Sequence, residues 1–151
     1  MQTSSVKIGW KVMLGTGIYV VVIGLLLIFL TKILFAPDFT SFTAQSWSDF
    51  LAASPKPAEL FLIMGRHDGA MVLVVGLFVV LMSWKSYRKA EKWAWYTLLI
   101  TGVIGWGSGI SYYIVVGDPI GRVMTIAGAV AFIIAIAFPA KAILGKKAAG
   151  K

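Results

Sequence analysis

The residue types that carry most enzyme chemistry are scarce in this chain of 151 residues. It has one histidine, His67, and no cysteine. The lack of cysteine excludes thiolate nucleophiles, disulfides, CxxC redox pairs and iron–sulfur ligation. One imidazole cannot supply the paired axial ligands of a membrane b-type haem, and no cluster of carboxylates or thiolates completes a zinc, copper or di-iron site. We therefore predict no metal site and assign no catalytic residue.

One group of charged and aromatic residues could still form a site. Charges close to the hydrocarbon core of a membrane are costly, so they indicate either pairing or function. The group, named the polar cluster, comprises Arg66, His67, Asp68, Asp118 and Arg122, with Tyr112 and Tyr113 as further members. Asp118 and Arg122 lie one helical turn apart with the acid first, which predicts a local ion pair. Arg66 could pair with Glu59 or Asp68.

Two interpretations of the polar cluster stay open. In the first, it is a network of ion pairs that fixes the ends of membrane helices. In the second, it is a site for an anionic headgroup, a quinone ring or a proton. A catalytic pair of His67 and Asp68 is not expected, because adjacent residues of a helix diverge by about 100° and do not face each other.

Four long apolar segments position these residues. Apolar residues make up 59% of the chain, which leaves too little polar surface to coat a soluble domain. A hydrocarbon core about 30 Å thick is crossed by about 20 helical residues. The sequence therefore predicts an all-α fold: a single integral membrane domain over 1–151, built as an antiparallel bundle of four transmembrane helices. The expected spans are about 12–35, 60–84, 93–117 and 119–144.

The distribution of charge orients this bundle. With both termini in the cytoplasm, ten of the fourteen lysines and arginines lie inside and five of the six acidic residues lie outside. This is the bias of the positive-inside rule, so we predict a multi-pass protein of the cell membrane with cytoplasmic termini. The basic residues lie at the ends of spans and form no stripe with interleaved aromatics, so the net charge of +8 does not indicate nucleic acid.

The segment between the first two spans is the one sizeable outer loop. We expect the first helix to break at Ala36-Pro37-Asp38, because proline disfavours helix continuation. Ser46 followed by Asp49 then has the spacing of a helix N-cap, and an apolar face follows at Trp47, Phe50 and Leu51. A short amphipathic helix is predicted here, either as an interfacial anchor or as a lid over a binding cavity.

Small residues recur every seven positions in all four spans. Close approach of helix backbones at such residues supplies packing that lipid does not drive. The stripes are Gly17, Gly24 and Thr31; Gly69, Gly76 and Ser83; Gly102 and Gly109; and Gly121, Gly128 and Ala135. They predict a tight bundle, and Gly105 with Gly109 forms a GxxxG pair that could contact a partner helix. Asp118 followed by Pro119 predicts the start of the fourth helix.

Several short runs are similar to a known group of proteins. They are Leu34-Phe35-Ala36-Pro37, Trp47-Ser-Asp-Phe-Leu51 with Pro55, Arg66 with Gly69, and Tyr87-Arg-Lys-Ala-Glu-Lys-Trp-Ala-Trp-Tyr96. Over about 14–113, the chain resembles small four-span prokaryotic membrane proteins of the loosely defined DoxX-like type. Most of these are uncharacterised, and a few relatives are subunits of thiosulfate:quinone oxidoreductase. The resemblance implies a four-span fold and transfers no catalytic residue.

The leading functional prediction is a non-catalytic integral membrane subunit or scaffold, part of a larger membrane complex or a homo-oligomer. The alternative is a quinone- or lipid-associated protein of a redox chain that uses the polar cluster. A small-solute transporter is the third hypothesis, disfavoured because the deep parts of the spans contain no acid or base. We predict membrane lipids as partners, no nucleic acid and no cofactor, with quinone or lipid as the ligands left open.

Overall fold

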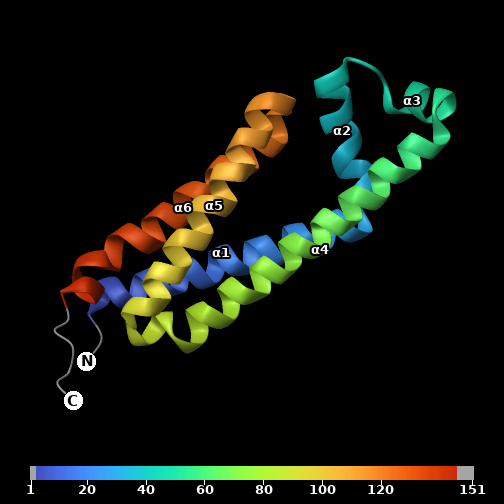
Figure 1. The fold of residues 1–151 in the computed structure, drawn as a ribbon. Coiled ribbons are helices and arrows are strands. Elements are labelled where there is room, and N and C mark those ends of the chain that lie inside the picture. Colours follow the sequence, from blue (N-terminus) through green and yellow to red (C-terminus); the bar gives the residue numbers. More distant parts are fainter. Residues whose placement is uncertain (1–2, 146–151) are drawn as a thin grey trace.

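A computed structural model describes residues 3–145 and is helical almost throughout (Figure 1). The elements are α1 (Ser4–Phe29), α2 (Thr31–Thr43), α3 (Trp47–Ala53), α4 (Pro55–Lys85), the 3₁₀ helix η1 (Tyr87–Lys89), α5 (Lys92–Val116) and α6 (Pro119–Leu144). No strand occurs in residues 3–145. Four helices are long and apolar enough to cross a membrane: α1, α4 with η1, α5 and α6. The predicted all-α fold is confirmed, and the chain has the makeup of an integral membrane protein.

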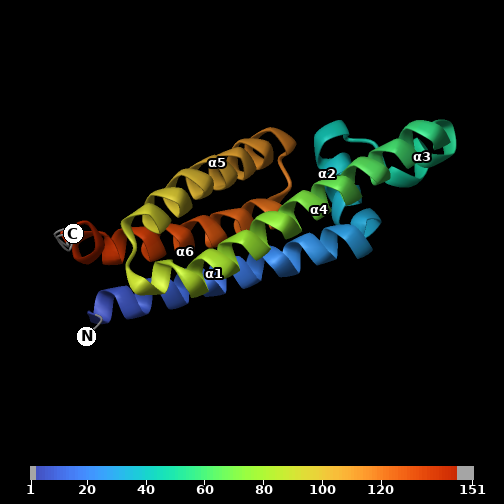
Figure 2. The same ribbon diagram turned by 60° about the horizontal axis from the view of Figure 1, so that its bottom comes forward.

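The four long helices form two antiparallel hairpins. α1 packs along α4, α5 packs along α6, and α1 also contacts α6. Figures 1 and 2 show that α5 leaves α4 after the turn at η1 and diverges from it. The arrangement is therefore more open than the tight bundle expected from the small residues. The start of α1 and the end of α6 lie at the same end of the molecule as η1, here called the η1 end. The turn between α5 and α6 lies toward α2 and α3, at what is here called the α2–α3 end.

The two long membrane helices of the first hairpin meet backbone to backbone. A Cβ atom added to Gly24 would lie 2.5 Å from the backbone nitrogen of Leu73, and one added to Gly76 would lie 2.6 Å from that of Val21. Both distances are too short for real Cβ atoms. Gly17 and Gly69 also face the opposite helix, where an added Cβ would lie 2.9 Å from a backbone nitrogen. The predicted small-residue stripes are confirmed here as the seam between α1 and α4.

The second hairpin, α5 with α6, packs through side chains placed on glycines. Aromatic side chains of each helix lie directly on glycines of the other: Phe132 on Gly102, Trp106 on Gly128 and Tyr113 on Gly121. The stripes again lie between neighbouring helices, but side chains, not backbones, fill the space. A Cβ atom added to Gly105 would meet nothing within 4 Å. That member of the GxxxG pair therefore makes no close contact with other helices in residues 3–145.

A proline in α6 shapes the packing at the η1 end. Pro139 has no N–H, so the carbonyl of Ala135, four residues earlier, loses its helical donor. The buried Tyr87 hydroxyl donates to that carbonyl at 2.6 Å. Next to it, the indole Nε1 of Trp95 donates to the carbonyl of Ile136 at 3.0 Å. Since an unpaired backbone carbonyl is costly in a membrane protein, the Tyr87 hydroxyl stabilises α6 by pairing with the carbonyl that the proline leaves without its helical donor.

The predicted break at Ala36-Pro37-Asp38 is wrong. α1 already ends at Phe29, and α2 continues through Pro37 to Thr43. The chain bends at Leu30, where the buried Thr31 hydroxyl donates to the carbonyls of Leu27 at 2.5 Å and Ile28 at 3.2 Å. The hydroxyl thus serves the last carbonyls of α1, and this local pairing allows the bend seven residues before the proline.

Both predicted helix starts are confirmed. The Ser46 hydroxyl accepts a hydrogen bond from the backbone N–H of Asp49 at 3.1 Å and caps α3. The Asp118 carboxylate accepts one from the N–H of Gly121 at 2.5 Å and caps α6. Three lysines counted on the cytoplasmic side in the charge argument, Lys146, Lys147 and Lys151, lie outside the described residues.

Candidate functional site

An aromatic cluster holds α2 and α3 against the start of α4. Phe39 stacks on Phe50 with ring centroids 4.5 Å apart, and Trp47 packs edge-on against Phe39 at 5.4 Å. Phe61 of α4 lies 5.6 Å from Trp47. Trp47 is only 7% exposed, and its indole nitrogen has no hydrogen-bond partner among the described residues. The cluster fixes the direction of α2, so it decides where the next residue of interest lies.

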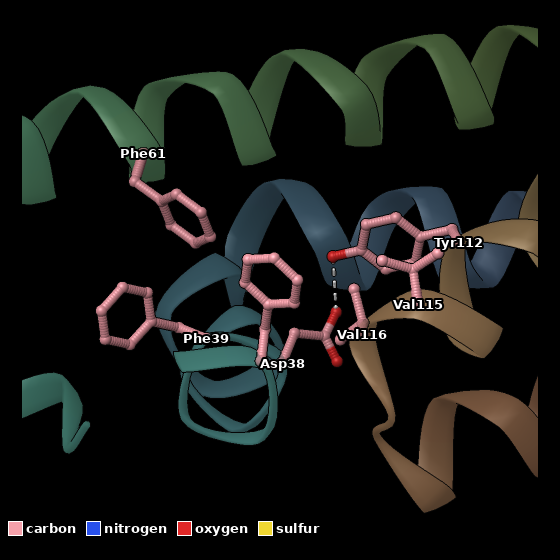
Figure 3. Close-up of a pocket in the computed structure, with 7 residues that line it drawn as sticks. Asp38, Phe39, Phe61, Tyr112, Val115 and Val116 are labelled. Carbon is pink, nitrogen blue, oxygen red and sulfur yellow. Dashed lines mark hydrogen bonds between the residues drawn. The ribbon is translucent and has the colours of Figure 1, made fainter. Parts of the chain in front are cut away.

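That residue is Asp38, which α2 directs toward α5. Asp38 is 6% exposed, and its Oδ2 accepts a hydrogen bond from the Tyr112 hydroxyl at 3.0 Å (Figure 3). Burial raises the pKa of Asp38 to about 6; the hydrogen bond from Tyr112 opposes this shift, and the nearby Asp118 adds to it. Among the described residues, no donor reaches the second carboxylate oxygen, Oδ1.

A pocket of about 420 Å³ lies beside this pair, within the size range of small-molecule sites. Figure 3 shows its walls coming from α2, α4 and α5. They are almost wholly apolar, and the lining residues are Asp38, Phe39, Phe42, Phe61, Tyr112, Val115 and Val116. The pocket is therefore an apolar space at the α2–α3 end with one carboxylate in its wall.

The α4 members of the polar cluster lie at the surface. Arg66, His67 and Asp68 are all exposed. His67 Nδ1 lies 3.8 Å from Asp68 Oδ1, with both side chains more than half exposed. No ion pair joins Arg66 to Glu59 or Asp68 in the described part of the chain, and Glu59 instead pairs with Lys56 at 2.8 Å. The expected pairs of Arg66 are thus not formed.

The other charged members of the cluster lie at the turn between α5 and α6. Asp118 is buried as the cap of α6, and its carboxylate is engaged by the N–H of Gly121. The Arg122 guanidinium donates a hydrogen bond to the carbonyl of Tyr113, with the two atoms 3.5 Å apart. No ion pair joins Arg122 to Asp118 among residues 3–145. The predicted local ion pair is therefore absent, and one carboxylate oxygen of Asp118 caps α6 instead. Of the whole cluster, Tyr112 alone lines the pocket.

The sequence points to Tyr112 only as a further member of the polar cluster, and it does not point to Asp38. Asp38 follows Pro37, where the sequence predicts a helix end, so that prediction does not place it on a helix facing α5. The run Phe35, Phe39 and Phe42 was the available signal, since it places aromatic residues three and four apart around Asp38. Such spacing indicates one helical face.

The pocket has one polar pair, the Tyr112 hydroxyl donating to Asp38, in walls that are otherwise apolar. What remains is an apolar space with an acceptor oxygen at its edge. Comparison of the chain with protein-family models, curated proteins and solved structures found no match. The resemblance to DoxX-like proteins stays a prediction.

Proposed function

We propose that this integral membrane protein is non-catalytic and holds a small amphipathic molecule in the pocket beside Asp38 and Tyr112. The observation that carries the proposal is an apolar pocket of about 420 Å³ whose wall includes Asp38, a residue only 6% exposed. Binding sites of this kind combine an apolar body with a few polar groups that orient the ligand.

The position of the pocket supports a ligand that dissolves in the bilayer. It lies where α5 ends, and Val115 and Val116 in its wall are among the last residues of that span. The charge distribution predicts that this end faces the outside of the cell. A lipid or a quinone, the ligands that the sequence analysis left open, could therefore reach the pocket from the outer leaflet.

The test uses two neighbouring residues of α5 that differ in one respect. Val115 and Ile114 are both 68% exposed, but only Val115 lines the pocket. Val115→Trp should fill the pocket and lower the amount of co-purifying ligand, measured by native mass spectrometry, by about tenfold. Ile114→Trp should retain it. If wild-type protein carries no more co-purifying amphipathic ligand than Val115→Trp, the proposal is refuted.

The subunit or scaffold role predicted from the sequence is a second candidate. It is favoured by the open space around Gly105, on a helix that diverges from α4. A helix of another subunit or of a second copy could approach there. Blue-native electrophoresis in a mild detergent tests this role, and Gly105→Leu should then break the complex. Migration of the wild type only as a lone monomer would count against it.

A further inference from the structure

The pocket walls have a composition that discriminates between classes of ligand. Four of its seven lining residues are aromatic: Phe39, Phe42, Phe61 and Tyr112. The faces of aromatic rings carry negative potential and attract cations. Quaternary ammonium groups, which have no N–H to donate, are bound by aromatic rings in this way. The rings come from α2, α4 and α5, so they approach the space from three elements. Such walls suit an apolar molecule, and they suit a cationic one better than an anionic one.

The hydrogen-bonding capacity of the walls argues against a quinone. A quinone carbonyl needs a donor. Among the side chains that line the pocket, only the Tyr112 hydroxyl can donate, and it already donates to Asp38 at 3.0 Å. A carboxylate only accepts. Asp38 therefore favours a ligand that donates a hydrogen bond or carries positive charge over one that only accepts.

The charges around the pocket argue against an anionic headgroup. No lysine or arginine is found among the lining residues. Asp38 is the charged residue in the wall, Asp118 lies close enough to act on it, and Asp68 lies close enough to act on Tyr112. An anion would enter a negative field in an apolar space, where such repulsion is weakly screened. A cation would meet the same field as attraction.

We infer that the pocket binds a lipophilic cation: an amine or quaternary ammonium group with an apolar tail, its head between Asp38 and the aromatic rings. The inference rests on the proposed function and names its ligand class. Positive charge offsets the cost of the buried carboxylate, the rings surround the head, and Val115 and Val116 contact the tail.

A dependence on pH follows. The groups that face Asp38 are Tyr112 and Tyr113 from α5 and Asp118, which caps the start of α6. With the pKa of Asp38 near 6, the carboxylate is mostly ionised at pH 7. A bound cation favours the ionised form, so affinity should be highest above pH 7 and fall by up to about tenfold per pH unit below pH 6.

The experiment measures equilibrium binding to the full chain in neutral maltoside micelles, with partition into protein-free micelles subtracted. The probes are dodecyltrimethylammonium, decylubiquinone and dodecyl phosphate. We expect the ammonium probe to bind at least about tenfold more tightly than the other two. Asp38→Asn should lower its affinity by about tenfold or more and flatten the pH profile. Asp49→Asn, which removes an exposed acid of α3, should change neither.

The outcomes separate the two proposals. If decylubiquinone or dodecyl phosphate binds wild-type protein as tightly as the ammonium probe, the cation inference fails while the pocket proposal stands. The same holds if folded Asp38→Asn retains full ammonium affinity. If no probe binds wild type better than Val115→Trp, both proposals fail. The comparison of probes on wild-type protein needs no variant, so a misfolded Asp38→Asn would not prevent the decision.

Discussion

The hydrogen bond from Tyr87 to the carbonyl of Ala135 should be strongly coupled to Pro139. Tyr87→Phe removes the donor at 2.6 Å and leaves the carbonyl of Ala135 without a partner, because residue 139 has no N–H to offer. A buried acceptor left unsatisfied costs about 1–3 kcal/mol, more than the net loss of an ordinary hydrogen bond. The ring of Tyr87 is 1% exposed, so water does not replace the lost hydroxyl.

Pro139→Ala changes that outcome. It supplies a backbone N–H one turn after Ala135, which can restore the helical bond to the carbonyl. In this background, Tyr87→Phe should cost only about 0.5 kcal/mol, the lower end for a hydrogen bond whose acceptor keeps another partner. The double-mutant cycle should therefore show a coupling free energy of about 1 kcal/mol or more.

Reversible unfolding by SDS in mixed micelles measures the four free energies of unfolding. Tyr19→Phe is the matched control: its hydroxyl donates to the carbonyl of Met124 at 3.1 Å, within a part of α6 where the carbonyl also has its helical donor. It should destabilise less than Tyr87→Phe and show no coupling to Pro139→Ala. Equal costs of Tyr87→Phe in both backgrounds would refute the assignment of the freed carbonyl.

Three further outcomes follow from the packing and from Asp38. Gly24→Ala places a Cβ 2.5 Å from a backbone nitrogen of α4 and should destabilise by about 1–3 kcal/mol in SDS unfolding, whereas Gly15→Ala, with nothing within 4 Å, should not. Trp47→Phe should cost less than half as much as Trp47→Ala in thermal unfolding, because it keeps the ring contacts and removes the unpartnered N–H. Burial raises the pKa of Asp38 from its ordinary 3.8 to about 6, so the folded state binds more protons between these values. Stability should then fall as pH rises from about 4 to 6, and Asp38→Asn should remove that fall in a pH series of unfolding midpoints.

The parts of the fold that follow from short-range rules were predictable from the sequence. The bilayer sets the length of a span, so four apolar segments were enough to indicate four long helices. Caps such as Ser46 and Asp118 act within one turn and could be found from spacing alone. The seven-residue repeats of small residues located the seam between α1 and α4, because that spacing keeps one face on one neighbour.

The pocket could not be predicted in the same way. Asp38 and Tyr112 lie 74 residues apart, and their contact depends on the bend at Leu30 that Thr31 stabilises. In the sequence Thr31 is one more small residue of a stripe, and Pro37 is the stronger signal for a break. The sequence favours the charged residues of the polar cluster as a site because charge near membrane spans is costly, yet Arg66 lies at the surface and Asp118 is a helix cap.

The two hairpins differ in a way that bears on the pocket between them. α1 and α4 touch through backbone atoms at glycines, so their spacing cannot change without separating the helices. α5 and α6 touch through aromatic side chains seated on glycines, and side chains can change rotamer while the helices stay in contact. Phe61 of the pocket belongs to the first hairpin and Tyr112 to the second. We therefore expect a ligand to be accommodated by movement of the α5 wall, with α4 as the fixed side, and Val115 to be the lining residue whose environment changes most on binding.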